Sequence, residues 1–250
     1  ETGADQVLNG DFSQEGSDVV VNGDFATDSD WSKGAGWTIS GSKAIQDGTN
    51  GDLQQTSLVA GLSYKVTLEV SDYVEGNLVV RLGSTNSVGT ITANGTYTFY
   101  GVASTTLLRF RGQTGFVGSI DNVSVVEVGQ DWALGTGVSI GDDKAIFTSA
   151  VSGQSVAQNA VASQIPNGTS VRVSFEVLSI SSGSFGVYFG GSLVGSLNSV
   201  GVASFYFKKG TETTFYIRSL GTTSGSISNI TVEEVGQEWT LSDGCSITAQ

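Results

Sequence analysis

The sequence contains no histidine, and among its 250 residues it has one cysteine and one proline. Without histidine the chain lacks the commonest general base near neutral pH and the commonest transition-metal ligand. The single cysteine, Cys245, excludes a disulfide between two cysteines of this chain. Paired carboxylates such as Asp142 and Asp143 stand in a predicted turn, where solvation explains them. The sequence therefore predicts that this chain is not an enzyme.

Basic residues are also scarce, since 11 Lys and Arg stand against 24 Asp and Glu and the formal net charge is −13. Binding to nucleic acid or to an anionic lipid surface requires a positive patch, so we expect neither partner. No stretch is apolar for long enough to span a membrane, so we expect no membrane insertion. A weakly charged, acidic composition is typical of proteins that work outside cells.

Helical patterns are missing too, because no window shows a sustained apolar stripe with a period of 3.6 residues. The chain instead holds 35 glycines, one proline and abundant Ser, Thr and Val. This composition favours short strands joined by tight turns. We therefore predict an all-β protein.

Two similar stretches, residues 118–132 and 225–239, divide the chain, and their offset is 225 − 118 = 107 residues. A second match joins residues 31–45 to residues 132–146 with an offset of 132 − 31 = 101 residues. The six-residue difference predicts an insertion in a loop of the second copy. A repeat of about 100 residues is too long for a solenoid, so each copy should be a domain with its own core.

These offsets predict four segments. Residues 1–16 are a linker or an extra edge strand, residues 17–128 the first domain, residues 129–235 the second domain, and residues 236–250 the start of a truncated third repeat. Residues 20–25 read Val-Val-Asn-Gly-Asp-Phe, and residues 7–12 nearly repeat them. We assign the second copy to the first domain, so the second domain is expected to lack this motif. Asn-Gly favours a turn or bulge.

Within each domain, apolar residues alternate with polar ones over segments about ten residues apart. Tyr64, Val66, Leu68 and Val70 share one face of a predicted strand, and Lys65 to Ser71 share the other. Eight or so such strands with one apolar face predict a two-sheet antiparallel β-sandwich. The pattern leaves open whether the strand order is that of an immunoglobulin or of a jelly roll.

Asn22–Phe25, Trp31, the strand at residues 64–70 and the terminal stretch at residues 118–125 resemble carbohydrate-binding module 4/9-like, galactose-binding-like jelly rolls. Such domains occur in secreted glycoside hydrolases and in tail-fibre and other virion appendage proteins of bacteriophages. The resemblance implies tandem antiparallel jelly-roll domains. It also implies a structural calcium ion in the first domain, with Asp24 and Asp121 as ligands. The second domain carries Ser228 at the position of Asp121, which argues against calcium there.

A sugar-binding surface needs exposed aromatic rings together with planar polar groups. The faces opposite the predicted core carry such residues, and we take them as candidate carbohydrate-binding residues: Tyr73, Arg81, Tyr100, Arg109 and Arg111 in the first domain, and Arg172, Tyr188, Tyr206, Tyr216 and Arg218 in the second. The alternative is that they are cross-strand partners covering a solvated sheet. Matched positions also differ in our alignment, which sets Thr98 against Tyr206.

Three tryptophans recur at the start of each copy, namely Trp31, Trp132 and Trp239. Their repetition favours a structural role, packing a junction or an end of the sandwich. Trp37 is not repeated and is the better candidate for a local function.

Together these patterns favour a structural and adhesive segment of a virion, such as a phage fibre, appendage or capsid decoration. Its partners would be a cell-surface or extracellular glycan and other virion subunits, arranged as a homo-oligomer whose avidity gives attachment. One alternative is the carbohydrate-binding region of a secreted bacterial polysaccharide-degrading enzyme. Another is a repeat segment of a bacterial surface adhesin or filament.

Overall fold

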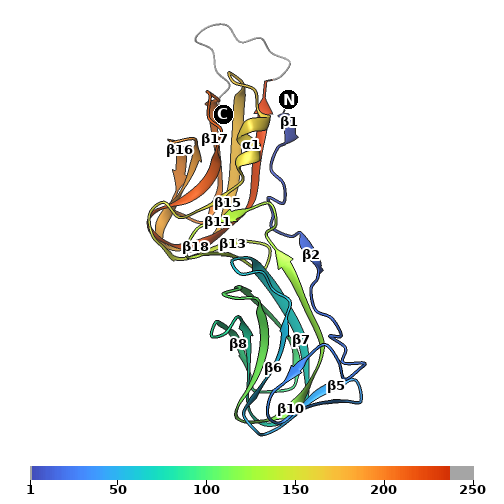
Figure 1. Cartoon of the computed structure of the whole chain (residues 1–250). Helices are drawn as coiled ribbons and strands as arrows, with labels where there is room; N and C mark the ends of the chain where they lie inside the picture. The colour runs from blue at the N-terminus through green and yellow to red at the C-terminus, as the bar shows by residue number, and fades with distance from the viewer. Residues whose placement is uncertain (1, 237–250) are drawn as a thin grey trace. The chain divides into compact units, whose positions relative to one another are not determined.

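A computed structural model describes residues 2–236, which form two compact units (Figure 1). One unit is continuous and consists of residues 15–128. The other is split, because residues up to 14 belong with those from 129 onward. We call them the continuous unit and the split unit. Both are built of antiparallel strands, which confirms the predicted all-β sandwich class.

Within residues 2–236 each unit contains nine strands in the same order, and the split unit adds one short helix. The continuous unit consists of β2 (Glu15–Asp18), β3 (Ser32–Lys33), β4 (Trp37–Ser40), β5 (Lys43–Asp47), β6 (Gly51–Thr56), β7 (Ser63–Leu82), β8 (Ser87–Ile91), β9 (Gly95–Val102) and β10 (Leu107–Val128). The split unit consists of β1 (Thr2–Asp5), β11 (Ala133–Leu134), β12 (Val138–Ile140), β13 (Ala145–Ala150), β14 (Ser155–Ala157), α1 (Asn159–Gln164), β15 (Ser170–Phe189), β16 (Ser192–Leu197), β17 (Gly201–Lys208) and β18 (Phe215–Val235).

The predicted insertion falls at two places. Leu53 of β6 faces Phe110 and its counterpart Val156 of β14 faces Ile217, which is an offset of 156 − 53 = 103 residues. Two of the six extra residues therefore precede β14, and the other four lie in the connection between β14 and β15, which contains α1. No helix among the described residues is long and apolar enough to cross a membrane.

In each sandwich two long strands run through both layers, and they pair with each other in each layer. In the continuous unit, residues 63–71 of β7 pair with residues 119–128 of β10, and residues 77–82 of β7 pair with residues 108–113 of β10. The first pairing and β9 form layer A, whereas the second pairing and β8, β6 and β3 form layer B. In the split unit β15 and β18 do the same, with β17 in layer A and β16, β14 and β11 in layer B.

The two layers pack against each other through every second side chain of their strands, and these side chains form the core. Tyr64, Val66, Leu68 and Val70 are at most 2% exposed, as their alternation predicted. The two layers approach so closely that a Cβ atom on Gly89 of β8 would lie 2.1 Å from the Phe99 ring of β9. Glycine is therefore required at this position. Each apolar side chain that is fully buried stabilises the fold by about 1.5–3 kcal/mol relative to leaving that side chain exposed.

The first residues of the chain complete the split unit. The strand β1 pairs antiparallel with the end of β18, and Figure 1 shows this blue strand beside the orange-red one. Phe12 is 1% exposed and packs on Trp132, with ring centroids 5.2 Å apart. Residues 2–14 are thus an edge strand and a buried anchor rather than a linker. The expectation that the second domain lacks the Asn-Gly-Asp-Phe motif is wrong, because residues 9–12 supply it.

The continuous unit uses the second copy of this motif in the same way. The strand β2 pairs with the end of β10, and Phe25 is 1% exposed with its ring centroid 5.3 Å from that of Trp31. Asn22 has a positive φ of 55°, as expected for a turn, whereas Gly23 does not. Glycine is needed for another reason, because a Cβ atom on Gly23 would lie 2.0 Å from the Val123 carbonyl oxygen.

The repeated tryptophans pack structurally, as their repetition indicated. Trp31 Nε1 donates to the Asn22 carbonyl and Trp132 Nε1 donates to the Asn9 carbonyl, both at 2.9 Å. Trp37 is also buried, and its indole donates to the Gly51 carbonyl at 3.1 Å, so it is a core residue and not a surface site. Trp239, Cys245 and the predicted third repeat lie outside the described residues.

Candidate functional site

The outer face of layer B brings together three predicted residues in each unit. Arg81 and Arg109 are register partners in the continuous unit, and Arg111 lies two residues further along β10. In the split unit the same three positions hold Tyr188, Tyr216 and Arg218. The two surfaces are therefore structurally equivalent but chemically different.

In the split unit the three side chains form one stack. The Tyr188 and Tyr216 rings are 5.4 Å apart and 16° from parallel. The Arg218 guanidinium carbon lies 3.7 Å from the Tyr188 ring centroid and 5.5 Å from that of Tyr216. This geometry is a cation–π contact, which holds the guanidinium flat against the rings. Tyr188 is 6% exposed, so the accessible parts of the stack are Tyr216 and Arg218.

Hydrogen bonds fix the stack in place but leave Arg218 without an acidic partner. The Tyr216 hydroxyl donates to the Gly190 carbonyl. Within residues 2–236 no carboxylate forms an ion pair with Arg218, and its Nε is buried without a partner. The guanidinium is thus held rigidly while its hydrogen-bonding capacity is not filled by the protein.

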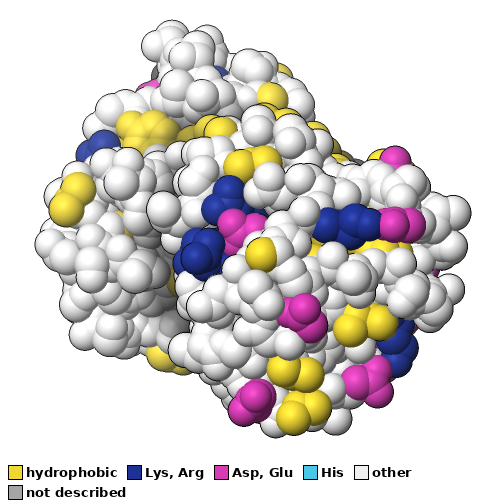
Figure 2. Space-filling view, turned by 60° about the horizontal axis from the view of Figure 1, so that its bottom comes forward, with side chains coloured by type: hydrophobic (Ala, Val, Ile, Leu, Met, Phe, Trp, Pro, Cys, Tyr) yellow, Lys and Arg dark blue, Asp and Glu magenta, His cyan; other side chains and the backbone are white. Residues whose placement is uncertain are grey.

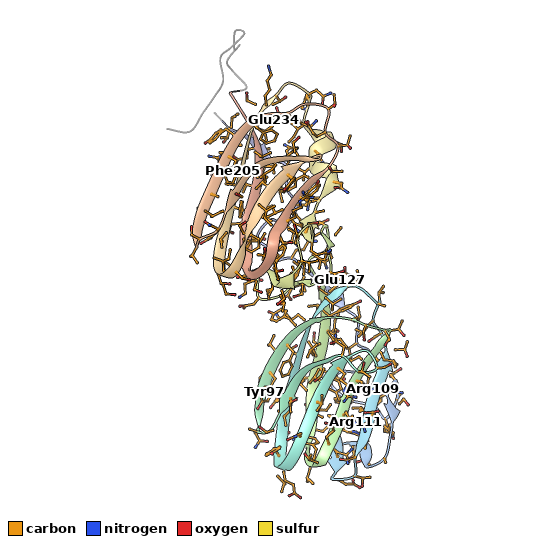
Figure 3. All side chains as sticks on the ribbon, turned by 90° about the vertical axis from the view of Figure 1, so that its left-hand side faces the viewer. Tyr97, Arg109, Arg111, Glu127, Phe205 and Glu234 are labelled. Carbon is orange, nitrogen blue, oxygen red and sulfur yellow. The ribbon has the colours of Figure 1, made fainter. Side chains whose placement is uncertain are left out.

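In the continuous unit two of the three arginines share one carboxylate. Arg109 lies 3.4 Å and Arg111 lies 3.3 Å from the Asp52 carboxylate, which projects from β6. Arg81 has no ion pair within the described part of the chain. Figure 3 shows Arg109 and Arg111 close together on β10, away from Tyr97 at the opposite side of the unit. This surface therefore carries a local excess of positive charge on a chain whose net charge is −13.

Most basic side chains are compensated by an acidic neighbour. On the face drawn in Figure 2, most basic side chains have an acidic side chain beside them. Lys33 pairs with Asp28, and Lys65 pairs with Glu15 at 2.7 Å. Between such pairs the surface is mainly uncharged and polar. Of the arginines in the described residues, Arg81 and Arg218 are the two without an ion pair.

The remaining predicted residues lie elsewhere, so the predicted single platform is not present in either unit. Tyr73 stands at the bend of β7, where its hydroxyl donates to the Gly76 carbonyl at 3.0 Å and its ring packs toward Phe116. Tyr100 and Tyr206 lie on the outer face of layer A, opposite Lys65 and Arg172 in the strand register.

Arg172 has a partner of its own on layer A. It donates a hydrogen bond to Glu233 on the neighbouring strand. That bond, followed by a weaker contribution from Tyr206, raises the pKa of the Arg172 guanidinium. Arg172 is therefore more firmly committed to the protein than Arg218 is.

The strand register also corrects one alignment made from the sequence. Val66 faces Phe99, and its counterpart Val173 faces Phe205. Gly195 moreover packs on Phe205 as Gly89 packs on Phe99. Phe99 is thus the equivalent of Phe205, and Tyr100 is the equivalent of Tyr206. The mismatch between Thr98 and Tyr206, which had argued against a common surface, does not exist.

The two predicted calcium ligands lie in segments that the fold brings together. Val123 donates from its backbone N–H to the Gly23 carbonyl at 2.9 Å, which joins the Asn-Gly-Asp-Phe turn to β10. Asp121 accepts a hydrogen bond from the Asn122 N–H at 2.7 Å, and Asp24 is exposed. The described residues contain no group of three or more acidic, cysteine or histidine side chains that could hold a metal ion.

The equivalent place in the split unit shows which oxygens converge there. Ser228, the counterpart of Asp121, places its hydroxyl 2.9 Å from the Asp143 carbonyl and 3.3 Å from the Asp11 carbonyl. Two backbone carbonyls and one side-chain oxygen thus meet at this point. A carboxylate there, with backbone oxygens around it, matches the donors that calcium prefers.

Sequence reasoning missed a pair of equivalent glutamines that hold the motif segments. Gln158 accepts from the Leu8 N–H at 2.8 Å and donates to the Leu8 carbonyl at 2.9 Å. Gln55 makes the same two bonds with Val21. Both glutamines are at least nine-tenths buried. The repeated glutamine, within β6 in one unit and directly after β14 in the other, was the available signal. The two glutamines are 158 − 55 = 103 residues apart, an offset that matches neither 101 nor 107, and this obscured the match.

No family model and no curated protein matches the chain. Among solved structures, the chain is similar to the N-terminal CBM22-1–CBM22-2 tandem domain from Paenibacillus barcinonensis Xyn10C. The two are 9% identical in sequence, and the TM-score is 0.34. The match covers 89% of this chain and 99% of that one.

Proposed function

We propose that the chain binds glycans through the outer face of layer B, with the split unit as its principal site. The observation that carries this proposal is the stack in which Arg218 lies over Tyr188 and Tyr216. A planar guanidinium held against two aromatic rings keeps its N–H donors in fixed positions. Several of these donors can bind neighbouring hydroxyl groups of a sugar. The partly exposed Tyr216 ring beside it can pack against the C–H face of a sugar.

A purely structural role for these residues is the alternative, since aromatic and basic side chains commonly cover a sheet face. Arg172 illustrates that role, because its charge is matched by Glu233. Arg218 lacks such a partner within the described residues, and a hydrogen-bonding group left unfilled in a rigid position favours recognition of a ligand.

The setting that we propose is an extracellular or virion appendage, in which tandem domains extend from a particle and attach weakly at several points. The sequence resemblance to fibre and appendage proteins supports this setting. Avidity over several copies would compensate for a shallow, weak site. The sandwich fold is equally compatible with a glycan-binding region attached to a secreted polysaccharide-degrading enzyme.

A glycan array probed with the full chain and three variants tests the proposal. Arg218→Met and Tyr216→Ala should each lose the wild-type signal, because they remove the donors and the ring. Tyr206→Ala is the matched control, since it removes an equivalent aromatic side chain from layer A and should bind as the wild type does. Binding that survives Arg218→Met but not Tyr206→Ala would assign the site to the other layer and contradict the proposal.

We also propose that a calcium ion stabilises the continuous unit. Asp121 would supply the carboxylate, and the backbone carbonyls that correspond to those around Ser228 would supply further oxygens. Asp24 is exposed, so its carbonyl rather than its carboxylate is the expected contribution. The ion would join the motif turn to β10 and would take no direct part in glycan binding.

A further inference from the structure

A hollow of about 340 Å³ lies on the split unit where β13, β15 and β18 run side by side. Its lining includes Lys144, Ile146, Phe147, Ser179, Ile180 and Ser226. None of these residues belongs to the surface formed by Tyr188, Tyr216 and Arg218. The volume is within the range of clefts that take small molecules.

The continuous unit carries the same row of residues at the same place. Ile45, Ser119 and Ser71 lie side by side on three neighbouring strands. In the split unit the row reads Ile146, Ser226 and Ser179. A lysine stands two residues before the isoleucine in both cases, namely Lys43 and Lys144.

In the continuous unit these side chains hold a carboxylate. The Asp72 carboxylate accepts hydrogen bonds from Lys43 at 2.9 Å, from Ser119 at 3.0 Å and from Ser71 at 3.4 Å. The bond from Lys43 and then the bond from Ser119 lower the pKa of Asp72. Lys43, Ser71 and Ser119 therefore surround a negatively charged carboxylate with three donors, and we call this arrangement the carboxylate seat.

The split unit places a serine where the continuous unit has the carboxylate. On both sides of the bend the strand pairing relates the two units by 107 residues, because Val70 corresponds to Val177 and Glu75 to Ser182. Ser179 therefore stands in the place of Asp72, although a bulge makes it the register partner of Ser226. Ser179 and Ser226 share a hydrogen bond of 2.8 Å with each other. Lys144 instead pairs with Asp142, whose side chain is 74% exposed and therefore easily displaced.

We propose that this hollow binds the carboxylate of an acidic sugar, that is, a hexuronate residue of a glycan. The ligand carboxylate would accept hydrogen bonds from Lys144 and Ser226, as Asp72 does from Lys43 and Ser119, and from Ser179 as a further donor. Ile146 and Ile180 line the hollow and offer an apolar wall to the sugar ring. This second site goes beyond the layer B surface and does not depend on it.

NMR titration of the full chain with methyl β-glucuronide and methyl β-glucoside tests the proposal, because these two probes differ at the carboxylate. The glucuronide should shift the backbone resonances of Ser179, Gly225 and Ser226, and the glucoside at the same concentration should not. Sodium acetate is a third probe in the titration. Because it carries the carboxylate but no sugar ring, it should bind more weakly than the glucuronide. Equal binding of acetate would overturn the assignment to a sugar.

Three variants give opposite expected changes. Lys144→Met should weaken glucuronide binding by about tenfold or more, because it removes the charged donor. Ser179→Asp should abolish binding, since it installs in the split unit, at the position of Asp72, the carboxylate that occupies the seat in the continuous unit. Asp142→Asn should strengthen binding, because it removes the local competitor for Lys144. A gain of this kind cannot result from misfolding.

The reciprocal variant Asp72→Ser should create a second glucuronide site, in the continuous unit. Unchanged affinity in Ser179→Asp and Asp142→Asn, or shifts confined to Tyr188, Tyr216 and Arg218, would overturn the proposal. Its failure is distinguishable from failure of the layer B proposal, because array binding that is lost in Arg218→Met but retained in Ser179→Asp supports layer B alone.

Discussion

The continuous unit and the split unit share a fold but differ in how the chain builds it. The continuous unit draws all nine strands from residues 15–128, whereas the split unit takes its first strand from the N-terminus and the others from residues after 128. The continuous unit is thus inserted within the split one. The two Asn-Gly-Asp-Phe copies follow each other by thirteen residues in sequence, yet each one completes a different sandwich.

The units also differ at equivalent surface positions. On layer B, Arg81 and Arg109 of one unit become Tyr188 and Tyr216 of the other. At the motif turn, Asp121 becomes Ser228, and at the bend of the long strand Asp72 becomes Ser179. Because the backbone pairing is the same in both, each unit is an internal control for the other.

The largest effect should come from the two motif phenylalanines. Phe12→Ala removes a ring that is 1% exposed and should destabilise the split unit by about 3–5 kcal/mol. Phe25→Ala should destabilise the continuous unit by a similar amount. Hydrogen exchange measured by mass spectrometry separates the units through peptides from β18 and β10. If Phe12→Ala accelerated exchange in β10 and left β18 protected, the assignment of residues 2–14 to the split unit would be wrong.

This insertion is also where prediction from the sequence reached its limit. Strand positions and the tandem repeat could be predicted, because alternation in segments such as residues 64–70 reports directly which face is buried. The partner of residues 7–12 could not, since both copies of the motif have the same local pattern and nothing in that pattern records which β-strand end they meet. Long-range pairing is a property of the tertiary structure.

The candidate surface was predicted in part for a similar reason. Alternation placed Tyr216 and Arg218 on the outer face, where both are partly exposed, but Tyr188, which we also expected to be exposed, is 6% exposed. Alternation did not separate layer A from layer B, because β7, β10, β15 and β18 each bend and serve both layers. Residues on the same face of one long strand, such as Arg172 and Tyr188, therefore belong to different surfaces. The loss of alternation around residues 72–76 was a signal of the bend, and Tyr73 stands within it.

Calcium should produce the next largest effect. Asp121→Ser gives the continuous unit the residue of the split unit, and Ser228→Asp makes the reverse change. Calcium at about 100 times its dissociation constant should stabilise the wild-type continuous unit by about 2.7 kcal/mol, and Asp121→Ser should lose that gain. Thermal unfolding with calcium and with EDTA measures it. Equal unfolding temperatures for the wild type under both conditions would contradict a calcium site, and a calcium response gained in Ser228→Asp would show that this single position distinguishes the units.

The smallest effect concerns acid. Asp72 accepts from Lys43, Ser119 and Ser71, and these bonds lower its pKa below the ordinary value of 3.8, led by Lys43. A carboxyl group whose folded pKa is lowered contributes stability that is present above the unfolded pKa and is lost as the pH falls through the folded pKa. Asp142 has a lowered pKa as well, caused by Lys144 alone, so its contribution should be smaller. We therefore expect Asp72→Asn to reduce the stability of the continuous unit at about pH 7 and to flatten its loss below the ordinary pKa, and Asp142→Asn to do less to the split unit. Urea unfolding, monitored by hydrogen exchange, measures this difference at about pH 7 and again at a pH below the ordinary pKa. An equal response of the two variants would mean that the serine hydroxyls add nothing to the lysine, and the seat argued for the split unit would then lose two of its three donors.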